Sequence, residues 1–161
     1  MNKLEQQLKE NCERNKSQLM QLNKEYELAK LGRDMSDVQS KDIYNKVLAE
    51  NTFYVSEDCP RMGVKAGDRI MDDDCSFLMS DTDFDRFTAL CNKEFYAAGI
   101  TTEDGTIITN WDMIFIKAKQ ALVYFLIDFI IPSPLREQFA QVKTSIVYQD
   151  KLLAAFSGCL R

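Results

Sequence analysis

The first thirty residues place the strongest constraint on the fold of this chain. From Asn2 to Leu31 there is no Gly or Pro, and Lys, Glu, Gln, Asn and Leu dominate the segment. All of these except Asn are good helix formers. The segment therefore predicts one long helix of about 45 Å, at about 1.5 Å per residue. Gly32 is placed to end it, because glycine readily adopts the left-handed conformation after a helix.

Apolar residues follow a narrow track along this predicted helix with the spacing of a heptad repeat. We call this track the seam, and its members are Leu8, Cys12, Asn15, Leu19, Leu22 and Tyr26. Two interpretations are open. Either the seam packs on the protein's own core, or it pairs with a second chain, in which case the polar Asn15 would fix the register at some cost in stability.

The next segments are shorter and of mixed type. A second helix is predicted over residues 36–49, with its apolar side chains turned inward: Val38, Ile43, Val47 and Leu48. The β-branched and aromatic run at residues 52–55 predicts a short strand, and two more are predicted at 69–71 and 76–79. An Asp-Gly step at residues 104–105 is typical of a hairpin turn.

Three more helices are predicted in the second half. Ser80 and Asp83 form a capping box for the first of them, and Gly99 is placed to end it. Residues 110–131 are the most apolar segment, but polar residues interrupt it, and its longest apolar run is far below the roughly 18 residues of a membrane span. We therefore expect a core helix with one polar edge: Lys117, Gln120, Tyr124 and Asp128.

The last predicted helix starts at Ser133 and Pro134 and ends at Gly158. Its expected buried face comprises Leu135, Phe139, Val142, Ile146, Leu153 and Phe156. The sequence thus predicts an α+β fold that is predominantly α-helical, with a long N-terminal helix, four further helices and a few short strands with a hairpin in the middle. Residues 1–33 would form the N-terminal helix, and residues 34–161 one globular domain.

The absence of histidine narrows the possible chemistry. None of the 161 residues is His, which removes Ser-His-Asp and Cys-His catalysis and His-ligated zinc. The five cysteines form no CxxC pair, so structural zinc is not expected. The N-terminal segment lacks an apolar signal region, and an odd cysteine number favours reduced thiols, so we expect a cytoplasmic protein.

Acidic residues are concentrated in the middle of the chain. Residues 51–110 hold 12 acidic and 5 basic side chains, a net charge of −7, whereas the whole chain carries −5. A candidate acidic surface comprises Asp68, Asp72, Asp73, Asp74, Asp81 and Asp85. Scattered basic residues and this charge argue against nucleic-acid binding. The surface could instead imitate nucleic acid and occupy a basic groove of another protein.

Two parts of the acidic segment resemble metal sites incompletely. Asp81, Asp83 and Asp85 match the start of an EF-hand loop, but Arg86 stands where the loop needs Gly and Asn92 where it needs Glu. In a strand, Asp72 and Asp74 could share one Mg²⁺. Helix capping and a solvated turn explain both patterns more simply, so no metal or cofactor is expected.

The absence of a complete catalytic motif favours a non-enzymatic interaction or assembly protein. We expect it to bind a protein partner or a second copy of itself through the N-terminal helix. One alternative is an inhibitory binder that uses the acidic segment 57–85, and another is a carboxylate- or Mg²⁺-dependent enzyme. A phage or mobile-element origin would suit such a chain, which would then act in the virion or the host cytoplasm.

Overall fold

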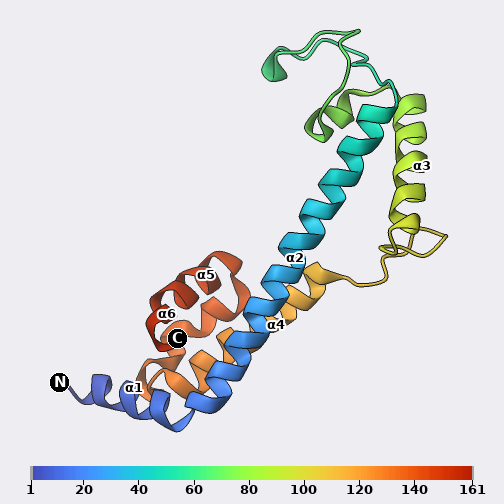
Figure 1. Ribbon diagram of the computed structural model, residues 1–161. Helices are drawn as coiled ribbons and strands as arrows, with labels where there is room; N and C mark the ends of the chain where they lie inside the picture. The colour runs from blue at the N-terminus through green and yellow to red at the C-terminus, as the bar shows by residue number, and fades with distance from the viewer. Residues whose placement is uncertain (1, 161) are drawn as a thin grey trace. The chain divides into compact units, whose positions relative to one another are not determined.

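The computed structural model describes the backbone of residues 2–160 and the side chains of residues 2–158 (Figure 1). Helices make up 75% of the chain. Their order is α1 (Lys3–Arg14), α2 (Lys16–Glu50), η1 (Pro60–Met62), η2 (Asp73–Leu78), α3 (Asp81–Ala97), α4 (Trp111–Phe125), η3 (Leu126–Ile130), η4 (Ser133–Thr144), α5 (Ile146–Ala155) and α6 (Ser157–Leu160). The prediction of a predominantly helical chain is confirmed.

Contacts between residues divide the chain into two compact units. Unit 1 contains the chain up to Arg33 and from Trp111 onward, and unit 2 contains Asp34–Asn110. The division predicted from the sequence is different, because it separates residues 1–33 from everything that follows. In the structure, the C-terminal helices pack with the N-terminal segment.

The N-terminal segment does not form one helix that ends at Gly32. A break at Asn15 separates α1 from α2, and α2 then runs without interruption through Gly32 to Glu50. At the break, Asn15 Nδ2 donates to the Asn11 carbonyl oxygen over 2.9 Å, which supplies a partner to the end of α1. The predicted helix at residues 36–49 is therefore the second half of α2.

The apolar helix predicted at residues 110–131 does form the centre of unit 1. It consists of α4 followed by the π-helical turn η3. Together they supply most of the buried core, whose members are Leu19, Leu122, Val123, Phe125, Leu126, Ile127, Ile130, Ile131, Leu152 and Leu153. Asn11 Nδ2 also donates to the Ile130 carbonyl oxygen over 3.1 Å, which ties α1 to η3. Among the described residues, no helix is both long and apolar enough to cross a membrane.

The prediction of a single C-terminal helix is wrong. Residues 133–144 form the 3₁₀ helix η4, and Ser145 adopts an extended conformation before α5 begins. Ser145 Oγ accepts the backbone N–H of Tyr148 as the N-cap of α5. The break also rotates Ile146 out of the expected buried face, so that it is 66% exposed. Gly158 lies within α6 rather than after a helix.

Unit 2 contains no β-sheet in its described residues, which corrects the predicted strands and hairpin. The β-structure consists of isolated bridges, Tyr54 with Arg69, Cys59 with Val64, and Thr101 with Ile107. Residues 76–78 belong to η2 instead of a strand. The apolar side chains of these segments are buried in a core made mostly by helices: Ile43, Val47, Leu48, Phe53, Val55, Ile70, Met79, Phe87, Cys91 and Phe95.

The capping signals around α3 are confirmed. Ser80 is the N-cap, and its side chain accepts the backbone N–H of Asp83 over 3.3 Å. At the other end, Gly99 has a φ of 75°, which glycine adopts without steric cost. These two residues fix the limits of the helix that covers the unit 2 core.

Candidate functional site

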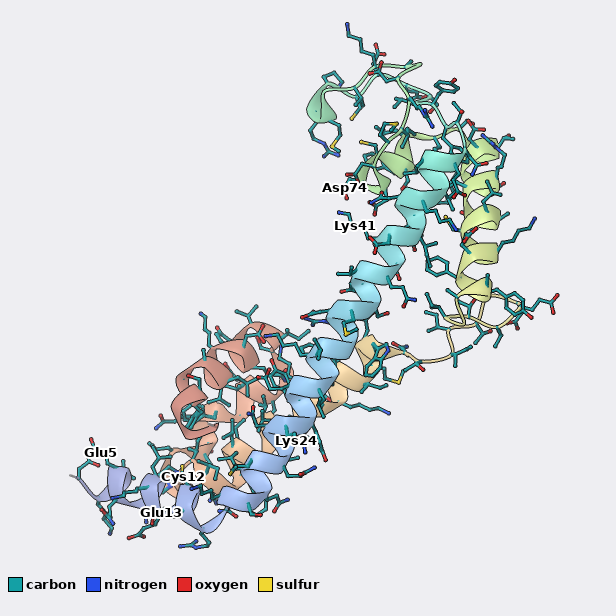
Figure 2. All side chains as sticks on the ribbon, viewed as in Figure 1. Glu5, Cys12, Glu13, Lys24, Lys41 and Asp74 are labelled. Carbon is teal, nitrogen blue, oxygen red and sulfur yellow. The ribbon has the colours of Figure 1, made fainter. Side chains whose placement is uncertain are left out.

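The seam predicted from the sequence is covered by the chain itself. Leu19 is 1% exposed within the core of unit 1, and Leu8, Cys12, Leu22 and Tyr26 pack against that core. Cys12 is labelled in Figure 2. Asn15 caps α1, as described above. The seam therefore follows the first interpretation given above, and a second chain would have to bind another surface.

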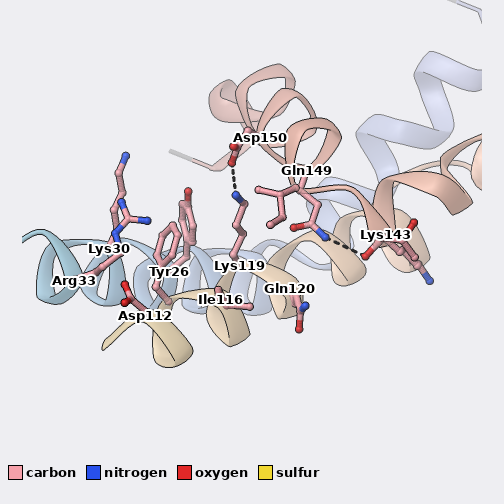
Figure 3. A pocket seen from close by; sticks show the side chains of 13 residues that line it. Tyr26, Lys30, Arg33, Asp112, Ile116, Lys119, Gln120, Lys143, Gln149 and Asp150 are labelled. Atoms are coloured by element: carbon pink, nitrogen blue, oxygen red, sulfur yellow. Dashed lines mark hydrogen bonds and ion pairs between the residues drawn. The ribbon is translucent and has the colours of Figure 1, made fainter. Parts of the chain in front are cut away.

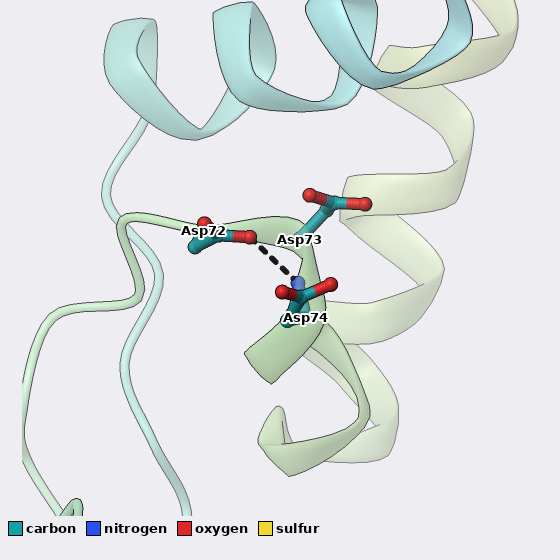
Figure 4. A group of neighbouring side chains, drawn as sticks. All are labelled: Asp72, Asp73 and Asp74. Carbon is teal, nitrogen blue, oxygen red and sulfur yellow. Dashed lines mark hydrogen bonds between the residues drawn. The ribbon is translucent and has the colours of Figure 1, made fainter. Parts of the chain in front are cut away.

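Three residues of the predicted acidic surface lie together. Carboxylate oxygens of Asp72, Asp73 and Asp74 come within 4.8 Å of one another (Figure 4). Among the described residues, no other acidic or cysteine side chains form such a group. Asp68 accepts the backbone N–H of Lys65 over 2.9 Å, and Asp81 and Asp85 lie on α3. Because residues 81–97 are helical, the EF-hand loop considered above does not form.

Local capping explains the position of the Asp72 carboxylate in this group. The Asp74 backbone N–H donates to Asp72 Oδ1 over 2.9 Å, which makes Asp72 the N-cap of η2. This hydrogen bond lowers the pKa of the Asp72 carboxyl, whereas burial raises the pKa of Asp73. These are contacts of an N-capped turn and do not require a bound ion.

Two of the described cysteine thiols, Cys75 and Cys91, lack the features of reactive groups. Cys12, Cys59, Cys75 and Cys91 are free thiols, and the side chain of Cys159 lies outside the described residues. Burial raises the pKa of Cys91 to about 11 and also raises that of Cys75. Both thiols therefore stay protonated near neutral pH, and the thiolate is the nucleophilic form.

An apolar stripe on α2 is exposed that sequence reasoning did not single out. Leu28, Leu31, Met35 and Val38 are 57%, 56%, 63% and 61% exposed. We call these four residues the α2 stripe. Their separations of three, four and three residues place them on one face of a helix. Val38 was expected to be buried. The four residues share one face only because α2 continues through Gly32, where a helix end was predicted.

Charged residues stand next to the α2 stripe. Lys24 precedes Leu28 by one helical turn, and Asp42 follows Val38 by one turn, so that both continue the line of the stripe. Glu27 and Lys41 lie beside the line of the stripe in the same heptad position; Lys24 and Lys41 are labelled in Figure 2. All four side chains are exposed. The face therefore combines an apolar centre with one cation and one anion at each end, and the charges in line with the stripe, Lys24 and Asp42, are opposite.

A cavity of about 670 Å³ lies within unit 1, where α2, α4, η4 and α5 meet (Figure 3). Lys119 and Gln149 line it, and both are among the few buried polar side chains of the described chain. Lys119 forms an ion pair with Asp150, and Gln149 Nε2 donates to the Lys143 carbonyl oxygen over 3.0 Å. The sequence pattern did not predict this cavity, because Lys119 resembled a polar interruption of an apolar helix.

Comparison of the chain with protein families, characterised proteins and solved structures finds no match. Two surfaces of the described residues, the α2 stripe and the unit 1 cavity, combine a defined residue pattern with nearby charges.

Proposed function

We propose that this protein is a non-enzymatic interaction protein that associates with a second copy of itself through the α2 stripe. The observation that carries the proposal is a row of four large apolar side chains, each more than half exposed, on one uninterrupted helix. Single exposed apolar residues are common on proteins, whereas contiguous apolar surface is typical of interaction sites. The proposal keeps the self-association expected from the sequence and moves the contact from the seam to the stripe.

The spacing of the stripe suits a helix from a second copy. Its residues alternate between the a and d positions of a heptad, which interdigitate when two helices pack side by side. Because α2 is one continuous helix, its own geometry sets this spacing. Burial of apolar area is the source of affinity, at roughly 25 cal/mol per Å² removed from water.

The flanking charges favour an antiparallel pair of helices. In that orientation a positions face d positions, so Leu28 meets Val38 of the partner subunit and Leu31 meets Met35 of the partner subunit. The same register brings Lys24 opposite the partner's Asp42, and Glu27 opposite the partner's Lys41. It also places Asp34 opposite the partner's Asp34, but the four opposite-charge contacts of the dimer outnumber this single like-charge contact. A parallel pair would instead bring Lys24 to the partner's Lys24 and Asp42 to the partner's Asp42, and like charges repel.

The two-fold symmetry of an antiparallel dimer doubles each contact between different residues. Each copy presents the same self-complementary surface, so every such residue pair across the interface occurs twice. Most homodimers are built in this way. The contact is compact, so we expect a reversible dimer whose population depends on concentration.

Sedimentation velocity across a concentration series tests the proposed surface. Val38→Glu places a charge in the stripe, and Val147→Glu is the matched control because Val147 is 62% exposed on α5, close to the 61% of Val38. We expect the wild type and Val147→Glu to dimerise and Val38→Glu to remain monomeric. Equal behaviour of the two variants, or a wild type that stays monomeric at all concentrations, would overturn the proposal.

Two alternatives from the sequence remain predictions. The inhibitory binder would use exposed carboxylates of unit 2, and the enzyme would use the same carboxylates to hold Mg²⁺. The capping role of Asp72 gives neither idea specific support. Self-association is favoured because a defined surface supports it.

A further inference from the structure

The unit 1 cavity has the size of a small-molecule site. Its volume of about 670 Å³ falls in the usual range of about 300–1,000 Å³ for ligand pockets. Helices from both ends of the chain contribute to the cavity, since its lining residues range from Tyr26 on α2 to Asp150 on α5. All of the lining residues belong to unit 1.

The cavity is positively charged in a chain that is negative overall. Four cationic side chains line it, Lys30, Arg33, Lys119 and Lys143, against two carboxylates, Asp112 and Asp150. The local excess is two positive charges, or one when Lys143 is left out because Asp128 neutralises it, whereas the whole chain carries −5. An anion would therefore be attracted to this cavity although the net charge of the chain repels it.

Lys119 is a buried cation at the wall of the cavity. Its side chain is 7% exposed, and its ion-pair partner Asp150 is 60% exposed (Figure 3). The Nζ atom also lies 5.7 Å from the centre of the Phe115 ring. Burying an ammonium group is costly, and an apolar side chain would fill this position at lower cost. A buried lysine whose partner can turn to solvent is suited to exchange that partner for a bound anion.

Two further groups of the cavity have unused hydrogen-bonding capacity. Within the described residues, neither Lys30 Nζ nor the Tyr26 hydroxyl has a hydrogen-bond or ion-pair partner. Figure 3 shows Lys30 and Arg33 on one side of Tyr26, and Lys119 with Asp150 on the other. Burial raises the pKa of Tyr26, so its hydroxyl remains a hydrogen-bond donor at neutral pH.

Aromatic contacts hold these donors in place. The Tyr26 and Phe115 rings are stacked with their centres 5.5 Å apart, and the Arg33 guanidinium lies 3.9 Å from the centre of the Phe115 ring. Lys143 is held outside this group by its 2.9 Å ion pair with Asp128. Preorganised donors lose little conformational entropy when a ligand binds.

We infer that the unit 1 cavity binds a small phosphorylated molecule, with its phosphate near Lys30, Arg33, Lys119 and the Tyr26 hydroxyl. A phosphate dianion carries two negative charges, so it gains more than a singly charged carboxylate from the local excess of positive charge. Asp112 and Asp150 are then available to accept hydrogen bonds from hydroxyl groups of the ligand. The cavity shares no residue with the α2 stripe, so the inference does not depend on self-association.

Isothermal titration calorimetry at constant ionic strength tests this inference, with ribose 5-phosphate and AMP as probes and ribose and adenosine as their unphosphorylated counterparts. We expect the two phosphate esters to bind and the two counterparts to give no heat. Inorganic phosphate separates the contribution of the phosphate group, and its binding should be weaker than that of the esters.

Variants then place the binding in the cavity. Lys30→Gln should weaken binding of ribose 5-phosphate at least tenfold, and Lys119→Met should do the same once its melting temperature shows that it folds. Lys16→Gln is the control, because it removes the same charge from an exposed position of α2 outside the cavity. Absence of binding by both esters at millimolar concentration, or equal binding by Lys30→Gln and Lys16→Gln, would overturn the inference.

Discussion

The indole ring of Trp111 lies directly over Gly32. A Cβ atom built on Gly32 would overlap three carbons of this ring, including Cδ2 at 2.8 Å. The glycine therefore allows α4 to begin against α2, and its role is a close approach rather than the end of a helix. Residues from the first and second halves of the chain are joined at this point within unit 1.

Gly32→Ala should destabilise the protein. The added methyl group has no space beneath the Trp111 ring, so we expect a loss of about 1–3 kcal/mol from overpacking, reduced by the better helix propensity of alanine. Trp111 is the only tryptophan, so its fluorescence reports the displacement directly. Denaturant titration followed by Trp111 fluorescence measures the displacement of the ring in the folded protein and the loss in unfolding free energy.

Gly158→Ala is the matched control for that substitution. Gly158 is also helical, and a Cβ there meets no atom within 4 Å. We expect this variant to be at least as stable as the wild type, by up to about 1 kcal/mol. The close approach at Gly32 would be refuted if both substitutions had the same effect on stability.

Asp150→Asn should destabilise unit 1 because it leaves the buried Lys119 without its anion. Since Asp150 is 60% exposed, water screens the pair, and we expect a loss of about 1 kcal/mol. Lys119→Met removes the buried charge and should stay within about 1 kcal/mol of the wild type.

The double variant separates the ion pair from packing. In the Lys119→Met background, Asp150→Asn should have almost no effect, because no cation remains to be paired. Urea unfolding of the four proteins completes the cycle. If Asp150→Asn costs the same in both backgrounds, the ion pair does not stabilise unit 1.

Ser80→Ala should destabilise α3 by about 1 kcal/mol. The Ser80 side chain accepts the Asp83 backbone N–H, which otherwise lacks a partner at the helix start. Hydrogen exchange of the first turn of α3 should accelerate together with the loss of stability. Thr82→Ala, at an exposed position in the same turn, should leave both quantities almost unchanged.

The stability of unit 2 should depend on the protonation of Cys91. Burial raises the pKa of Cys91 from 9.0 to about 11, so the unfolded chain loses this proton at lower pH than the folded chain. The stabilisation is complete below pH 9 and is lost as the pH rises towards about 11, because the unfolded state then binds fewer protons.

The difference in unfolding free energy between the wild type and Cys91→Ala isolates this contribution. The other titratable groups are present in both proteins, whereas only the wild type carries the Cys91 thiol. The advantage of the wild type should shrink between pH 9 and pH 11. A difference that is constant over this range would show that Cys91 has the same pKa in the folded and unfolded states.

Local signals in the sequence were sufficient to predict several elements. Ser80 and Gly99 mark the ends of α3 because capping depends on a few neighbouring residues. The apolar residues of α4 and η3 form the core of unit 1 because their burial follows from hydrophobicity. The predicted polar edge is also present, with Lys117, Tyr124 and Asp128 exposed.

Features that depend on distant partners could not be predicted in the same way. Glycine can end a helix or allow a close approach, and only the position of Trp111 distinguishes these roles for Gly32. The prediction that a helix ends at Gly32 also placed Leu31 and Val38 on two different helices, so the α2 stripe was not recognised. In the sequence Lys119 was only a polar interruption of an apolar helix, and its burial could not be predicted because it depends on α5 and Asp150.

The short strands were overestimated for a related reason. Phe53, Val55 and Ile70 have strand-forming side chains and are buried, but they pack in a core made mostly by helices. β-Propensity indicates that a side chain fits a partly buried surface, and it does not supply a neighbouring strand. The isolated bridges of unit 2 are therefore the only β-structure among its described residues.

The most direct test of the central claim is the dimer dissociation constant of four proteins by sedimentation equilibrium: the wild type, Lys24→Glu, Asp42→Lys and the variant with both changes. In the antiparallel dimer each single change creates two like-charge contacts, so we expect dissociation constants about tenfold higher. The double change restores opposite charges and should restore the wild-type value. A monomeric wild type, or a double variant as weak as the single ones, would contradict self-association through an antiparallel α2 stripe.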